Sequence, residues 1–253
     1  MKFGFCIGGD VERVRIASAV GADYVETGFE VLARDDGTEY DAFRTALEQF
    51  SLKCESANCF IPGGMKLTGE NVDYEKIGKY VDRGMDRGKE IGLKTVVFGS
   101  GGARSVPESF PFDRAFRQLV YFLREIAGPI GEKYGINVVV EPLCDCNIIK
   151  TAKEGVMLAA AADRPNVFGL VDLFHMAKMQ DNVENIRDLK GMIGHAHIAE
   201  PSRRVYPKDA SEYDYKSFID ALEYAGCPRC SVEAGSSDFA ADAPAAIQLL
   251  RIL

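Results

Sequence analysis

The chain alternates eight times between a short apolar run and a segment in which apolar residues recur at helical spacing. Short continuous runs rich in β-branched residues are typical of strands that are buried on both faces. Strict alternation of strand and helix predicts a parallel β/α fold, and eight units favour a closed (β/α)8 TIM barrel over an open sheet. The runs lie at residues 2–8, 24–28, 53–60, 95–100, 137–143, 167–174, 193–199 and 230–235.

The length of the chain agrees with one such unit. The chain has 253 residues, and single barrels of about 250 residues are common. No linker or low-complexity segment divides it, so we expect one barrel domain over residues 1–253. The segment CIGGDVER after the first run lacks the glycine spacing of a dinucleotide site. Within the helical segment 112–134, Gly128-Pro129 is expected to kink or interrupt the helix.

Charge and cysteine content exclude some classes of function. The formal net charge is −8, which argues against non-specific binding to a nucleic acid backbone. No stretch is apolar and long enough to span a membrane, and the N-terminus lacks a signal-peptide core, so we expect a cytoplasmic location. The seven cysteines are odd in number and are expected to be reduced. The pair in C-P-R-C is expected to pack as thiols, whereas Cys144 and Cys146 follow Glu141 and could face a site there.

Four of the later runs carry a residue that can bind a divalent metal ion near their end. These residues are Glu141, Asp172, His197 and Glu233, separated by 31, 25 and 36 positions. Each gap is about one strand–helix unit, and parallel strands align their carboxyl ends at one face of a barrel. The four side chains should therefore converge. Three carboxylates and one imidazole suit one divalent ion such as Mn²⁺, Mg²⁺, Co²⁺ or Zn²⁺.

The seventh run contains two histidines whose side chains point the same way on a strand. His197 is favoured as the ligand because it is closer to the carboxyl end of the run, and His195 is expected to pack behind it.

These motifs together resemble those of a known family. V-E-P in the fifth run, D-x-x-H in the sixth, H-x-H-I-A-E-P-x-R in the seventh and V-E in the eighth resemble the xylose isomerase-like barrel superfamily. Within it, the chain is similar to the sugar phosphate isomerase/epimerase group, which includes ketose 3-epimerases, hydroxypyruvate isomerase and inosose dehydratase. The resemblance covers nearly the whole chain.

The resemblance implies roles for individual residues. The positions that match Glu141, Asp172, His197 and Glu233 hold one metal ion in the ketose epimerases, and the two glutamates also form the acid/base pair. The positions that match His175 and Arg203 contact substrate oxygens. The epimerases carry a second glutamate six residues after the first, whereas this chain has Asn147 there and Asp145 two residues earlier. That difference leaves the identity of the substrate open.

The residue types fit proton transfer beside a carbonyl group. A metal ion that binds the carbonyl and a neighbouring hydroxyl stabilises an ene-diolate. One carboxylate removes the proton, and a second on the opposite face returns one. A neutral His175 can donate to a substrate oxygen. We therefore expect an isomerase or epimerase of a small ketose, ketose phosphate or related hydroxy-carbonyl compound. The expected partner is a small carbohydrate substrate, and neither a nucleic acid nor a membrane is expected. The sequence leaves open whether the chain forms a homo-oligomer.

Loops after the earlier runs supply further candidates. The glycine-rich segment 98–105 ends near Arg104, which either holds a substrate phosphate or carboxylate or is an exposed loop residue. The segment 58–69 begins with Asn58, a candidate for substrate binding, and is expected to cover a pocket. Phe5 and Glu26 also stand at strand ends, where Phe5 could equally serve packing.

Three other functions compete with the isomerase prediction. A metal-dependent lyase, such as a dehydratase of a polyol ketone, would use the same first proton abstraction. An abasic-site endonuclease would need more histidines than the three in this chain. A barrel without catalytic activity, kept for binding or as a scaffold, is disfavoured because buried carboxylates without an ion repel one another.

Overall fold

The computed structural model describes residues 1–253 and contains one closed barrel of eight parallel strands in sequence order. Each predicted run overlaps one strand, so the predicted (β/α)8 barrel is confirmed. The strands are shorter than several of the runs because the last apolar residues of those runs belong to the loops that follow. They are β1 (Lys2–Cys6), β2 (Tyr24–Gly28), β3 (Cys54–Asn58), β4 (Thr95–Phe98), β5 (Asn137–Val140), β6 (Val167–Asp172), β7 (Ile193–Ile198) and β8 (Arg229–Val232).

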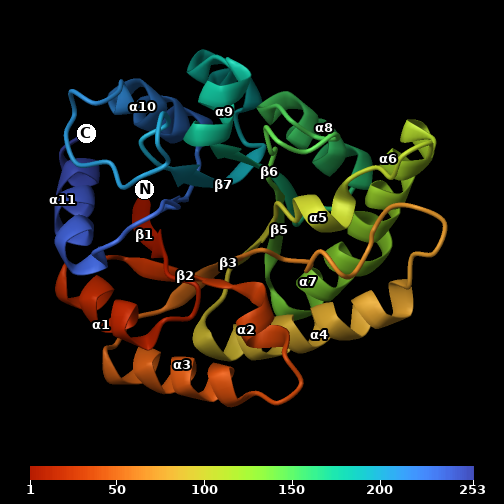
Figure 1. The fold of residues 1–253 in the computed structure, drawn as a ribbon, viewed down its shortest axis with the longest axis horizontal. Coiled ribbons are helices and arrows are strands. Elements are labelled where there is room, and N and C mark those ends of the chain that lie inside the picture. The colour runs from red at the N-terminus through yellow and green to blue at the C-terminus, as the bar shows by residue number, and fades with distance from the viewer.

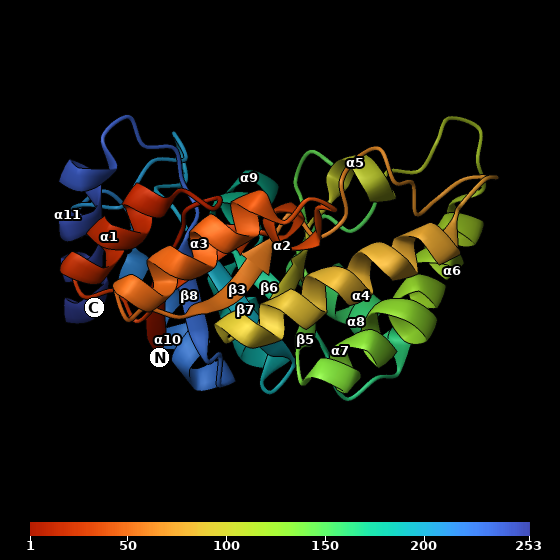
Figure 2. The same ribbon diagram turned by 90° about the horizontal axis from the view of Figure 1, so that it is seen from below.

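The helices surround the strands as a ring (Figure 1). They are α1 (Val11–Ala19), α2 (Phe29–Ala33), α3 (Thr38–Gln49), α4 (Tyr74–Ile91), α5 (Gly101–Arg104), α6 (Phe112–Tyr121), α7 (Gly128–Tyr134), α8 (Ala152–Ala162), α9 (Leu173–Met179), α10 (Tyr215–Ala225) and α11 (Phe239–Ile252), with η1 (Phe122–Ala127) and η2 (Val183–Leu189). In Figure 2, α5 and α9, which follow strand ends, lie on the upper side, and the N-terminus lies on the lower side.

Helices α6 and α7 are joined by the π-helical segment η1. Pro129 has no N–H group for the ordinary helical bond one turn back, and Gly128 lowers helix propensity. The wider turn before them lets the chain continue into α7, where Pro129 occupies a first-turn position. The expected interruption therefore takes the form of a π-helical turn.

The inside of the barrel differs from the layer between the barrel and its helices. The main apolar core has 72 buried residues, whereas a separate apolar cluster contains only Val97, Val139 and Leu170. Because side chains alternate along a strand, Glu141 and Asp172 point to the same side as Val139 and Leu170. The interior therefore changes from apolar to polar toward the carboxyl ends of the strands.

Strand register brings the later strand ends side by side. Asp172 of β6 pairs with His197 of β7, and His197 pairs with Ser231 of β8. Strand β8 then pairs with β1 and closes the barrel. None of the helices combines the length and the apolar character that a bilayer crossing requires.

Candidate metal and active site

The four strand-end residues meet at the mouth of the barrel. Each of Glu141, Asp172, His197 and Glu233 offers a ligand atom, and these atoms all lie within 4.8 Å of one another. The Nδ1 atom of His197 is 3.1 Å from Oε1 of Glu141 and 3.5 Å from Oε2 of Glu233. Side chains that are up to 92 positions apart along the chain thus share one small volume, as the spacing of the strands predicts.

The crowded carboxylates suit a bound cation. Asp172 is 2% exposed, and its Oδ2 has no hydrogen-bond partner. Burial, and then the charges of Glu141 and Glu233, raise the pKa of Asp172 to about 7. Burial and Glu233 also raise the pKa of Glu141. A divalent ion would bind the unpartnered oxygen of Asp172 and relieve the repulsion among the three carboxylates. These residues therefore fit a divalent metal ion.

Glu141 is packed against the backbone of the loop after β4. A Cβ atom built on Gly99 would lie 2.1 Å from Oε2 of Glu141. No side chain fits at position 99 unless the carboxylate moves, so this glycine is needed for the close approach.

Glu233 is held on both of its oxygens. Asn58 Nδ2 donates to Oε1 at 2.8 Å, and Arg204 Nη2 donates to Oε2 at 2.6 Å. Burial alone would raise the pKa of Glu233, but His197 and Arg204 outweigh it and lower the pKa to about 2. The two glutamates therefore have opposite shifts. Asn58 lies at the site, and its contact in this structure is with Glu233.

Glu26, which the sequence left open, joins both histidines of β7. Its side chain is fully buried. Its Oε1 is 2.9 Å from Nε2 of His197, and its Oε2 is 2.8 Å from Nε2 of His195. Ser231 Oγ also donates to Oε2 at 2.6 Å. This network assigns a proton to Nε2 of His197 and leaves Nδ1 to face the carboxylates, which is the common arrangement behind a metal-bound imidazole.

A cavity of about 340 Å³ opens beside this cluster. His175 lines it; its Nδ1 accepts a hydrogen bond from the Cys144 N–H at 3.2 Å, and its Nε2 has no partner. Burial, and then Arg204, lower the pKa of His175 to about 4, so the ring is neutral with Nε2–H free. The lining residues are Cys59, Ile61, Gly63, Gly99, Ser100, Gly101, Gly102, Glu141, Leu143, Asp145, His175, Arg204 and Glu233.

Asp145 lines this cavity, and Asn147 does not. Both polar atoms of Asn147 pair with the backbone of Val106, at 2.9 Å each. Of the two candidates near the epimerase position, the structure turns Asp145 toward the cavity. The segment 58–69 contributes Cys59, Ile61 and Gly63 to the wall, as expected for a covering loop.

Arg204, rather than the predicted Arg203, lines the cavity. The Arg203 side chain is 67% exposed and bonds to Glu200. Arg204 adopts a positive φ of 53°, which turns its side chain into the cavity and over the ring of Phe174 at 4.7 Å. The predicted position of Arg203 at the substrate is therefore not observed, because its side chain lies outside the cavity that Arg204 lines.

Arg104 does not face the cavity. It is fully buried, and its guanidinium donates to the carbonyl oxygens of Phe98 (2.8 Å), Glu141 (2.7 Å) and Ile149 (3.3 Å). The glycine-rich segment folds into α5 and directs this side chain inward. The predicted contact with a substrate phosphate or carboxylate is therefore wrong. Phe5 packs between Tyr206 and Phe239, which supports its packing role.

A larger cavity, of about 540 Å³, lies beside α2 and α4, away from these strand ends. Its charged side chains pair with one another, as in Arg83 with Asp35 and Lys79 with Glu75. It offers no cluster of metal ligands, so the catalytic candidate remains the cavity at the barrel mouth.

Comparisons with known proteins agree with this architecture. A 2-oxo-tetronate isomerase from Pectobacterium atrosepticum is 32% identical over 105 residues, which cover 38% of this chain and 40% of that protein. A 2-oxo-tetronate isomerase from Haemophilus influenzae is 22% identical over 226 residues, or 86% of each chain. The crystal structure of D-allulose 3-epimerase from Methylomonas sp. in complex with D-allulose matches with a TM-score of 0.84 and 18% identity, covering 100% of this chain and 96% of that one.

A family model provides the broadest match. The model described as xylose isomerase-like TIM barrel matches residues 14–253, which include all four residues of the cluster. Because the match spans nearly the whole chain and the observed barrel has the fold that the description states, the chain belongs to the xylose isomerase-like TIM barrel family.

Proposed function

We propose that this protein is a divalent-metal-dependent isomerase or epimerase of a small ketose, ketose phosphate or related hydroxy-carbonyl compound. The observation that carries the proposal is the meeting of Glu141, Asp172, His197 and Glu233 beside a cavity large enough for a small substrate. The relatives support the class of reaction, since they are named as an isomerase of a 2-oxo-tetronate and as a ketose epimerase. Both reactions change a carbon next to a carbonyl group.

The four residues of the cluster would hold one divalent ion, with Nδ1 of His197 as the nitrogen ligand. When bound, the ion acts as a Lewis acid that stabilises negative charge on substrate oxygens. The choice among Mn²⁺, Mg²⁺, Co²⁺ and Zn²⁺ stays open, because oxygen and imidazole ligands serve all four.

The two glutamates are the proposed acid and base. Glu141 follows β5 and Glu233 follows β8, so they approach the cavity from different sides of the barrel. Their pKa values shift in opposite directions, upward for Glu141 and to about 2 for Glu233. Environments that separate the pKa values of two carboxyl groups are typical of an acid/base pair. One removes the proton beside the carbonyl, and the other returns a proton to the resulting ene-diolate.

Three residues orient the substrate in this proposal. The free Nε2–H of neutral His175 can donate to an oxygen on which charge develops. Arg204 supplies the positive charge of the cavity wall, and Asp145 supplies an acceptor for a hydroxyl group. The covering segment 58–69 limits access of water to the reacting carbon.

The proposal predicts carbon–hydrogen exchange with solvent. The Mn²⁺-loaded protein should incorporate deuterium beside the carbonyl of at least one member of a panel of ketoses and ketose phosphates in D₂O, as followed by NMR. Glu233→Gln keeps the size of the side chain and removes the base, so exchange should fall by about 10²-fold or more while the fold is retained. Glu223→Gln makes the same change on the exposed face of α10, serves as the matched control and should exchange at the wild-type rate.

The same spectra distinguish the competing reactions. A product that has lost a hydroxyl group would show that the protein is a lyase and not an isomerase. No exchange with any member of the panel, or undiminished exchange in Glu233→Gln, would contradict the proposed roles.

A further inference from the structure

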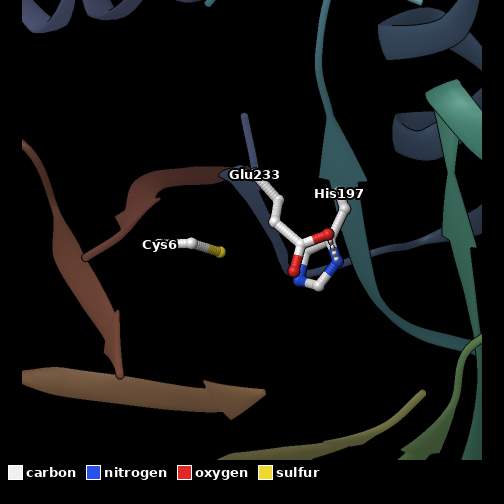
Figure 3. Close-up of side chains that lie close together, drawn as sticks. All are labelled: Cys6, His197 and Glu233. Carbon is white, nitrogen blue, oxygen red and sulfur yellow. Dashed lines mark ion pairs between the residues drawn. The ribbon is translucent and has the colours of Figure 1, made fainter. Parts of the chain in front are cut away.

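One guanidinium nitrogen lies among the proposed ion ligands. Nη2 of Arg204 donates to Oε2 of Glu233 at 2.6 Å and is 3.9 Å from Oδ2 of Asp172. The same Oε2 is 3.5 Å from Nδ1 of His197, the nitrogen proposed to bind the ion, and Figure 3 shows the carboxylate of Glu233 directed toward that ring. The positive charge of Arg204 therefore lies beside two of the oxygens that a bound ion would use.

Arg204 is a permanent positive charge beside these carboxylates. A guanidinium stays protonated throughout the ordinary pH range. Burial would lower the pKa of Arg204, but the charges of Glu233 and Asp172 outweigh it and raise that pKa. Both carboxylates therefore attract the guanidinium, and a divalent ion on the same oxygens would repel it.

The backbone of Arg204 is fixed, whereas its side chain is not enclosed. The Arg204 N–H donates to the carbonyl of Glu200 at 2.8 Å, and the Gly235 N–H donates to the carbonyl of Arg204 at 2.9 Å. The side chain is 38% exposed, and its guanidinium lies over the ring of Phe174 at 4.7 Å. Rotation about the bonds of this long side chain is therefore enough to move the charge away from Glu233, without a change in the loop.

We propose that Arg204 is a resident cation that leaves Glu233 and Asp172 when a divalent ion binds. In the metal-free protein its guanidinium neutralises these two carboxylates. In the metal-bound protein the guanidinium turns into the cavity, where it pairs with an oxyanion of the substrate. Arg204 thus lowers the affinity of the site for the ion, and by reciprocity the ion makes Arg204 available to the substrate. The inference rests on the metal site of the proposed function and adds a regulation of that site.

The test is a calorimetric titration of chelator-treated protein with Mn²⁺. Arg204→Gln removes the charge and keeps a polar side chain, so Mn²⁺ affinity should rise by about tenfold or more, because the repulsion between two cations is lost. If Arg204 only oriented Glu233, its loss would lower the affinity instead. Arg204→Lys keeps the charge and should bind Mn²⁺ less tightly than Arg204→Gln. Arg203→Gln makes the same change on a side chain that is 67% exposed, and this matched control should bind Mn²⁺ as the wild type does.

Thermal unfolding measures the same competition from the other side. Without the ion, Arg204→Gln should have a lower Tm than the wild type, because the carboxylates lose their cationic partner, and saturating Mn²⁺ should reduce this difference. Equal or weaker Mn²⁺ binding in Arg204→Gln, or a Tm difference that Mn²⁺ does not change, would overturn the inference. Neither readout needs a substrate, so such a result rejects only the role of Arg204. A wild type that binds no Mn²⁺ would reject the metal site of the proposed function and this inference with it.

Discussion

Glu26 contacts the histidines of the site without lining its cavity. One of its oxygens accepts from His197, and the other lies within hydrogen-bond distance of His195 and Ser231. Burial would raise the pKa of Glu26, but the charges of His197 and His195 outweigh it and hold that pKa well below its usual range. A fixed acceptor behind Nε2 orients the ring and directs Nδ1 toward the ion.

Replacing this acceptor should weaken ion binding. Glu26→Gln keeps the size of the side chain but places an N–H₂ group against one of the two imidazoles. We expect Mn²⁺ affinity to fall by about 10–100-fold, as for other partners of ligating histidines, which calorimetry measures directly. Ser231→Ala removes one donor to Glu26 and leaves the carboxylate in place, so it should have a smaller effect. Equal Mn²⁺ affinity in Glu26→Gln and the wild type would show that the ring needs no such partner.

Single residues differ in how far the sequence predicts them. Glu141 and Asp172 stand at the ends of apolar runs, and parallel strands fix where such ends lie. The choice between Arg203 and Arg204 depends on one left-handed backbone angle, which no pattern in the residues specifies. Glu26 lies within a strand, and its role depends on which strands surround it in the closed barrel.

Arg104 of the short helix α5 links the ends of β4 and β5 to the loop that follows β5. Its guanidinium binds carbonyl oxygens from the end of β4, from Glu141 and from Ile149 in the next loop. All three of these hydrogen bonds go to carbonyl oxygens, so carbonyl dipoles stabilise this charge. The contact joins two strand ends and the loop that carries Asp145.

Loss of this contact should destabilise the fold. Arg104→Met removes the charged donor from three carbonyl oxygens, and hydrogen bonds to a charged group contribute about 1.5–3 kcal/mol each. The carbonyls of Phe98 and Ile149 keep a backbone donor, whereas that of Glu141 loses the arginine. We expect the free energy of unfolding in urea to fall by at least about 3 kcal/mol. Arg104→Lys should recover only part of it, because one ammonium group cannot reach all three oxygens. A raised KM with unchanged stability would instead restore a substrate-binding role for Arg104.

Elements were predictable where periodicity is strong. The eight apolar runs are short and bounded by helical segments, so the strand count and the closed topology follow from them. The π-helical turn before Pro129 could not be foreseen, because the sequence shows only that an ordinary helical bond is missing. The direction of the Arg104 side chain in α5 depends on carbonyl groups at distant positions along the chain, which no local pattern specifies.

At the scale of the molecule, the proposed ion joins the second half of the barrel, since its ligands come from β5 to β8. Binding to the folded state alone stabilises it by about 2.7 kcal/mol at one hundred times the dissociation constant. This stabilisation depends on pH, because protons compete for the same oxygens.

The direction of the pH effect follows from Asp172. Its pKa is raised to about 7 by burial and by Glu141 and Glu233, above the value of about 3.9 in an unfolded chain. Between about pH 3.9 and about pH 7, Asp172 is protonated in the metal-free folded state and ionised in the unfolded chain. The contribution of Asp172 to the free energy of unfolding therefore falls as the pH rises through this range. An ion displaces that proton, so its affinity and its stabilising effect increase up to about pH 7.

Thermal unfolding measures this dependence. The increase in Tm on adding Mn²⁺ should be larger near pH 7 than near pH 5, with a chelator-treated sample as the reference at each pH. Asp172→Asn removes the titrating group, so it should bind the ion more weakly and show a flatter pH profile. The same increase in Tm at both pH values would contradict proton competition at Asp172.

The pairing of β1 with β8 has a consequence for how the protein matures. Cys6 is synthesised long before Glu233, yet both lie at the same seam. Glu26 of β2, the acceptor behind His197, takes its place beside that ring only in the closed barrel. The recovery of full Mn²⁺ affinity during refolding would therefore report the moment at which the cylinder closes.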